Sequence, residues 1–143
     1  MNQLFGKSKT ELLKSLKNKF KLFFEKHILE KEFFRSKIIL WLLALNVVTN
    51  IVNWVVIAIF INRLDGDIIL HYNVYFGVDS MGDWRRIFIL PVIGIILLAL
   101  NAALAAYFYT KKERIASYIL LLVALMAQIN LIIAATSILM INY

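Results

Sequence analysis

The side chains best able to do chemistry in this sequence are amides that lie inside long apolar segments. Asn46, Asn50 and Asn53 are spaced four and three residues apart, so they share one face of a helix. Amides in such positions either line a polar pathway for an ion or a proton, or hydrogen-bond across helix contacts. We favour interhelical hydrogen bonding, because none of the apolar segments contains Asp, Glu, Lys, Arg or His.

Amides on the other two apolar segments occupy faces that also carry small residues, which let helix backbones approach closely. Asn101 shares its face with Gly94, and Gln128 shares its face with alanines. Asn50 and Gln128 lie near the middle of their segments, whereas Asn46 and Asn101 lie about 4–5 Å nearer one end, at 1.5 Å per residue. The sequence therefore predicts two pairs inside a single bundle, Asn50 with Gln128 and Asn46 with Asn101.

A second set of polar side chains lies between the first two apolar segments, where β-branched and aromatic residues predict an extended segment over the end of the bundle. His71, Asn73, Asp79 and Asp83 offer nitrogen and oxygen atoms to a metal ion. They include one histidine and no tight cluster of three or four ligands, so we expect a packed, hydrogen-bonded loop and no metal site. Together with Gly77, these residues form the candidate surface for a binding partner.

The same loop resembles a known family. The N-terminal domain of unknown function of the SdpI-like membrane proteins has a span, a Leu-Pro-x-x-Ile-Pro-x-His-Trp-Asn motif, spaced Gly, Asp and Gly, and a second span with an early proline. Some members are immunity proteins against a secreted toxin, so the resemblance implies an immunity or signalling role. It covers about residues 38–109, with Tyr72 where the family has Trp, and runs through Leu64, Ile68, His71, Asn73, Gly77, Asp79, Gly82 and Pro91.

Three apolar stretches must position these residues: 38–61, 87–109 and 115–141. Each exceeds the roughly 20 residues that a helix needs to cross a bilayer. The chain has 143 residues, of which 62% are hydrophobic, and its mean hydropathy is +0.77. These features predict an all-α membrane protein, a three-transmembrane-helix bundle over residues 38–143 with an outer loop over 62–86.

The segment that precedes the first span is strongly basic. Residues 1–37 carry ten Lys or Arg against four Glu, and Ser8 followed by Glu11 is a capping-box pattern. Leucines and phenylalanines recur at helical spacing with lysines on the other faces, which predicts an amphipathic helix. Beside a span, such a helix favours anionic lipid head groups over nucleic acid. The alternative is a helix that folds back onto the cytoplasmic ends of the bundle.

Loop charge predicts the orientation of the spans in a cell membrane, because Lys and Arg concentrate on the cytoplasmic side. The basic N-terminus is expected inside, the acidic first loop outside, the second loop inside and the C-terminus outside. The residues on which this depends are Arg63, Asp65, Asp67, Asp79 and Asp83 in the first loop, and Lys111, Lys112 and Arg114 in the second. Arg85 and Arg86, at the end of the first loop, are the exception, and their long side chains can reach the lipid head groups at small cost.

The sequence constrains the function of the protein less than its architecture. There is no cysteine, no Ser/His/Asp grouping and no Gly-rich phosphate loop, so we expect neither an enzyme nor a cofactor. The leading hypothesis is a protein that binds a membrane or extracellular partner, or a second copy of the chain. The alternative is an accessory subunit of a larger membrane complex, with Asn53 or Asn130 at its docking faces.

Overall fold

The structure is a computed structural model that describes residues 11, 13–19, 31–61 and 66–143. Residues 11 and 13–19 are helical, and the remainder of the predicted amphipathic helix before residue 31 lies outside the described residues. The elements that follow are α2 (Lys31–Arg35), α3 (Lys37–Ile61), β1 (Asp67–Asn73), β2 (Gly77–Asp83), a 3-10 helix η1 (Trp84–Phe88), α4 (Ile89–Thr110) and α5 (Arg114–Ile141).

The three predicted spans are confirmed as helices long and apolar enough to cross a membrane, which fits a multi-pass membrane protein. They extend over Lys37–Ile61, Trp84–Thr110 and Arg114–Ile141, and the shortest has 25 residues. At 1.5 Å per residue, each exceeds the roughly 30 Å thickness of the hydrocarbon core.

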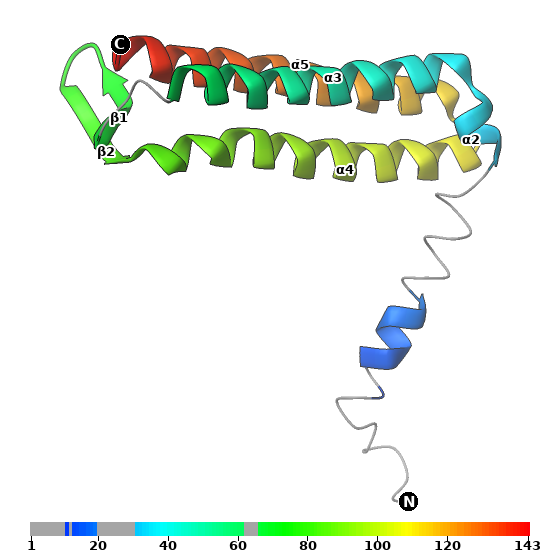
Figure 1. The fold of residues 1–143 in the computed structure, drawn as a ribbon. Helices are drawn as coiled ribbons and strands as arrows, with labels where there is room; N and C mark the ends of the chain where they lie inside the picture. The colour runs from blue at the N-terminus through cyan, green and yellow to red at the C-terminus, as the bar shows by residue number, and fades with distance from the viewer. Residues whose placement is uncertain (1–10, 12, 20–30, 62–65) are drawn as a thin grey trace, which may run out of the picture.

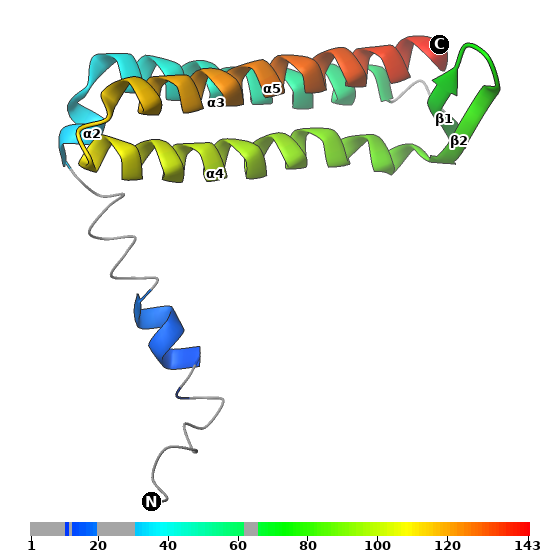
Figure 2. The same ribbon diagram turned by 180° about the vertical axis from the view of Figure 1, so that it is seen from behind.

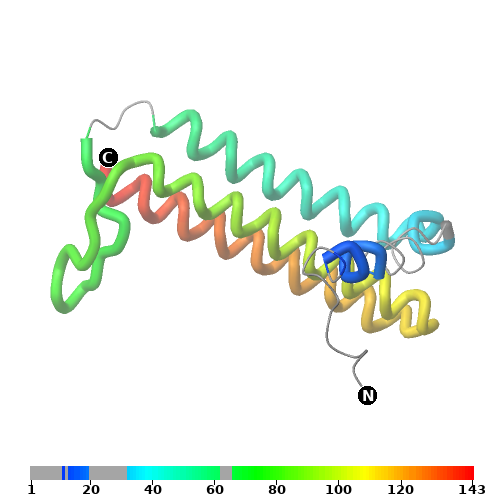
Figure 3. Tube along the Cα trace, turned by 90° about the horizontal axis from the view of Figure 1, so that it is seen from below, coloured from blue at the N-terminus to red at the C-terminus, as the bar shows by residue number. Residues whose placement is uncertain are grey.

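The helices lie alongside one another, with the β1–β2 hairpin at one end of the bundle and α2 at the other (Figures 1 and 2). We call these the hairpin end and the turn end, the latter after the tight α4–α5 turn at Lys111–Glu113. Helix α5 packs against both α3 and α4, whereas α3 and α4 contact each other less. Seen from below the view of Figure 1, the hairpin projects sideways from the bundle (Figure 3).

The prediction of an all-α chain was incomplete, because the extended loop forms an antiparallel two-stranded sheet. Three residues, Val74 to Phe76, connect the strands, and Gly77 then adopts a φ of +81°, where a side chain would be strained. The pairing shifts register around Leu70 and Asp79. These irregularities interrupt the alternation of polar and apolar residues by which a paired strand is usually recognised.

The last residues of the chain hold the hairpin against the bundle. The Asn142 side chain, just beyond α5, accepts a hydrogen bond from the Ile69 backbone N–H at 2.8 Å and donates one to the Ile69 carbonyl at 2.8 Å. It therefore pairs with β1 as a neighbouring strand would. Ile68, next to it in β1, is buried.

Helix α2 folds back onto the turn end of the bundle. Whether the predicted amphipathic helix before it does the same lies outside the described residues. Phe33 is 1% exposed and belongs to a buried cluster with Ile39, Ala105, Ala106 and Leu121. The chain bends at Ser36, whose carbonyl accepts from the Leu40 N–H and so begins α3. This apolar anchor fixes the position of α2.

Pro91 does not interrupt a helix. The Asp83 carboxylate does cap a helix, accepting from the Arg85 N–H at 2.8 Å, but that helix is the short 3-10 segment η1. Helix α4 begins afterwards, at Ile89. Pro91 therefore lies in the first turn of α4, where its missing N–H is tolerated.

Candidate functional site

A cluster of buried amide hydrogen bonds joins all three helices near the middle of the bundle. Asn50 Nδ2 of α3 donates to Gln128 Oε1 of α5 at 3.0 Å and to the Pro91 carbonyl of α4 at 3.0 Å. Gln128 Nε2 donates in turn to the Gly94 carbonyl at 2.8 Å. We call these two side chains and two carbonyls the amide cluster. The predicted pair of Asn50 with Gln128 is confirmed.

Gly94 allows this close approach because it has no side chain. A Cβ at this position would lie 2.5 Å from Gln128 Oε1 and 2.6 Å from Asn50 Nδ2. Real Cβ atoms do not approach other atoms so closely, so the absence of a side chain at Gly94 makes room for the amide cluster.

Trp54 completes the hydrogen bonding of Asn50, which the sequence did not reveal. Its Nε1 donates to Asn50 Oδ1 at 3.1 Å, and its ring lies 5.6 Å from the Phe88 ring. The position of Trp54 one helical turn after Asn50 was the available signal. All the polar atoms of the Asn50 side chain are therefore used in contacts.

The predicted pair of Asn46 with Asn101 is wrong. Asn46 Nδ2 donates to the carbonyls of Leu42, at 2.8 Å, and Leu121, at 3.1 Å. Asn101 Nδ2 donates to the Leu97 carbonyl of its own helix at 2.9 Å. A carbonyl one turn earlier is always within reach of an asparagine in a helix, so similar depth in the bundle does not by itself produce a pair.

Asn53 and Asn130 were candidate docking positions, and they differ in burial. The Asn53 side chain is fully buried, and none of its polar atoms hydrogen-bonds within the described part of the chain, so it is not available to another subunit. Asn130 is exposed on α5 and donates to the Met126 carbonyl of its own helix at 3.0 Å.

A serine that sequence reasoning missed joins α4 to α5 near the turn end. Ser117 is buried, and its Oγ donates to the Ala105 carbonyl at 2.8 Å. Together with the bonds of Asn46, Asn50 and Gln128, this contact shows what the buried polar groups do. Each of these four side chains joins one helix to a carbonyl or amide of another, as expected of interhelical contacts in lipid.

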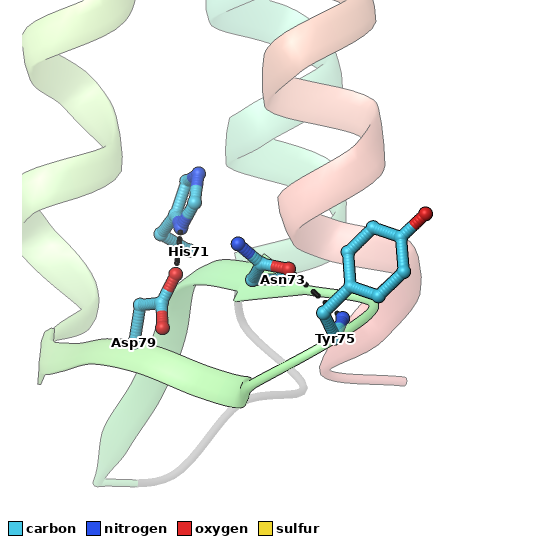
Figure 4. A network of polar contacts seen from close by, with 4 residues as sticks. All are labelled: His71, Asn73, Tyr75 and Asp79. Atoms are coloured by element: carbon cyan, nitrogen blue, oxygen red, sulfur yellow. Dashed lines mark hydrogen bonds and ion pairs between the residues drawn. The ribbon is translucent and has the colours of Figure 1, made fainter.

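The candidate loop residues are distributed along the hairpin rather than gathered at one point. His71 Nδ1 lies 3.1 Å from Asp79 Oδ2, and Asn73 Oδ1 accepts from the Tyr75 N–H at 2.9 Å (Figure 4). Asp83 is used as the cap of η1, at the end of β2. Within the described ranges, no three His, Cys, Asp or Glu side chains come together where they might hold a metal ion.

The most unusual surface of the hairpin lies between the predicted residues. Val74, Tyr75 and Phe76 are 84%, 90% and 83% exposed, and we call them the hairpin tip. The Tyr75 ring points toward the side of the sheet on which the helices lie (Figure 4). Three consecutive apolar side chains between two turn-forming residues, Asn73 and Gly77, were the signal available in the sequence.

Comparison of the chain with protein-family models, curated proteins and solved structures finds no match. The geometry of the hairpin and the bundle therefore carries the functional argument.

Replacing Asn50 with leucine should destabilise the bundle without preventing its insertion. The substitution removes three contacts, and at about 0.6 kcal/mol each the expected loss is about 2 kcal/mol. Asn130→Leu is the matched control, because the Asn130 amide donates only to its own helix, and its effect should stay within roughly 0.5 kcal/mol. Unfolding in detergent, followed by circular dichroism, measures both. Equal effects of the two substitutions would contradict the role given to Asn50.

Replacing Gly94 with alanine should be costly, because the new methyl group displaces the hydrogen-bonded ends of Gln128 and Asn50. The expected loss is about 1–3 kcal/mol, as for other overpacked sites. The same substitution made in an Asn50→Ala/Gln128→Ala background should cost clearly less, since both side chains that the methyl group would meet are then shortened. A Gly94→Ala penalty that is unchanged in that background would show that the close approach is not its cause.

Proposed function

We propose that this chain is a non-enzymatic membrane protein that binds a protein partner through its hairpin. The observation that carries the proposal is the hairpin tip, three consecutive apolar side chains exposed on a connection between two paired strands. Exposed apolar groups that gather at one place mark protein or membrane contacts, and aromatic residues supply much of the energy of such contacts. Asn142 holds β1 against the bundle, so the hairpin should lose little further conformational entropy when its tip binds a partner.

The two strands differ in the edge that they offer to a partner. At Ile69, the outer edge of β1 is already paired with Asn142. All residues of β2 are exposed or half-buried. An extended segment of a partner can therefore add beside β2, with main-chain hydrogen bonds giving affinity and the tip giving specificity. The partner in this proposal is an extended, apolar segment of a membrane or extracellular protein.

Loop charge supports the location proposed for this contact, outside the cell, with the N-terminus in the cytoplasm and the bundle in the cell membrane. The resemblance to SdpI-like proteins supports an immunity-like or signalling role, in which the partner is a secreted peptide. The basic N-terminal segment would add a second contact, with anionic lipid head groups on the cytoplasmic side.

A second candidate function, an accessory subunit of a membrane complex, is favoured by one polar strip on α5. Asn130 and Ser137 are both exposed, and their spacing of seven residues places them on one helix face. Polar groups on an otherwise apolar transmembrane surface are typical of helix contacts. In this alternative that face meets another subunit.

Impermeant thiol reagents test the orientation on intact cells. The chain has no cysteine, so a single introduced one is the only site of labelling. A cysteine at Asp67 should react without permeabilisation, whereas one at Lys112 should react only after it. The reverse pattern would overturn the orientation and place the hairpin in the cytoplasm.

A photo-reactive amino acid in place of Tyr75 should form an adduct of fixed mass with a protein partner, and a Val74→Ala/Phe76→Ala background should abolish it. The matched position is Ile119, which is exposed on the apolar surface of α5 and should cross-link only to lipid. Mass spectrometry of the adduct identifies the contacted segment. The same photo-reactive amino acid placed at Asn130 tests the alternative, because protein adducts there and none at Tyr75 would favour the accessory subunit. Lipid adducts alone at Tyr75 would show that the tip contacts the membrane.

A further inference from the structure

A wide-open polar depression of about 410 Å³ lies at the turn end of the bundle, opposite the hairpin. Its lining comes from α2, from the bend before α3, from α4 and from α5, and we call it the turn-end cavity. The residues that line it are Glu32, Arg35, Ser36, Tyr109, Arg114 and Tyr118. All six side chains carry a polar atom, in contrast to the apolar surface of the three long helices.

Both arginines of the turn-end cavity remain available to a ligand. Within the described residues, neither Arg35 nor Arg114 forms an ion pair. Arg114 lies with its guanidinium carbon 5.7 Å from the centre of the Tyr109 ring, which orients the side chain without using its N–H groups. The cavity therefore has two free guanidinium groups and one carboxylate, that of Glu32, for a net charge of +1.

The cavity depends on packing that fixes α2. Phe33, between Glu32 and Arg35, is buried in the bundle, and its ring lies 5.6 Å from the Tyr109 ring. This contact places Arg35 beside the last turn of α4 and the first turn of α5. The Tyr109 and Tyr118 hydroxyls make no hydrogen bond in the described part of the chain, so both can donate to an acceptor.

From this arrangement we infer that the turn-end cavity binds the phosphate of an anionic phospholipid. Arginine forms paired hydrogen bonds with phosphate oxygens, and the tyrosine hydroxyls add donors. The cavity opens where the apolar spans end, which is the level of lipid head groups, so the acyl chains can lie along the bundle. The net charge of +1 on the lining favours an anionic lipid over a zwitterionic one.

This inference is separate from the proposed hairpin contact, which lies at the other end of the bundle. It also differs from lipid binding by the part of the basic N-terminal segment that precedes α2, because here α2, α4 and α5 together supply a defined set of lining residues. The control variant must therefore remove positive charge from this end of the bundle without changing a residue that lines the cavity.

Native mass spectrometry of the full chain in a non-ionic detergent, titrated with phosphatidylglycerol, tests the inference. Arg35→Gln/Arg114→Gln should weaken retention of the first lipid about ten-fold, since paired hydrogen bonds of two charged groups are lost. Lys111→Gln/Lys112→Gln removes the same charge from the same end without altering the cavity, so its effect should stay below about two-fold. Equal losses in the two variants, or no loss in either, would overturn the proposed site.

Further variants and ligands test the assignment of the cavity to an anionic phospholipid. Arg35→Lys/Arg114→Lys keeps the charge but not the planar donor pairs, so retention should fall between that of the wild type and that of the glutamine variant. Tyr118→Phe should weaken retention while leaving the helix content unchanged, which separates ligand binding from folding. Phosphatidylcholine should be retained less well than phosphatidylglycerol, and equal retention would overturn selectivity for an anionic lipid. Displacement of the lipid by inorganic phosphate would identify a soluble ligand and overturn the lipid assignment.

Discussion

The amide cluster is the contact on which the arrangement of the helices depends. In hydrocarbon, packing alone brings helices together with little preference for their relative height, because lipid tails are as apolar as leucine. Hydrogen bonds from Asn50 and Gln128 to each other and to the α4 carbonyls of Pro91 and Gly94 fix that height for all three helices. Sliding a helix by one turn would break these interhelical hydrogen bonds. A carbonyl of the same helix can accept from the freed amide N–H, but Gln128 Oε1 would lose its donor at a cost.

Both proposed binding regions depend on this register, since α5 contributes to each. Arg114 at its first residue lines the turn-end cavity, and Asn142 just beyond its last residue pairs with β1. The helix between them is held near its midpoint by Gln128. A helix shifted or rotated there would misplace both ends, so the buried amides act on regions that they do not touch.

The sequence predicted the parts of the fold that repeat over many residues. The three spans were recognisable because apolar composition is summed over more than 20 positions. The pair of Asn50 with Gln128 was recognisable because both lie near the middle of their spans, on faces with polar or small residues. Asn46 and Asn101 were mispaired because backbone carbonyls compete equally well for an amide donor. The pairing of the hairpin was not evident, since its two irregular positions break the period of a strand. The contact of Asn142 with Ile69 joins residues 73 positions apart, and no local pattern reports it.

That separation has a consequence for the order in which the molecule is made. Ribosomes add about 5–20 residues per second, so Ile69 is synthesised several seconds before the asparagine that pairs with it. During that interval the Ile69 N–H and C=O lack the side chain that later pairs with them. The contact forms only after α5 has followed α3 and α4 in synthesis, and until then the edge of β1 is open to the same edge of a second nascent chain. The hydrogen bonds that hold the hairpin in place are therefore made later than the hairpin and the first two spans.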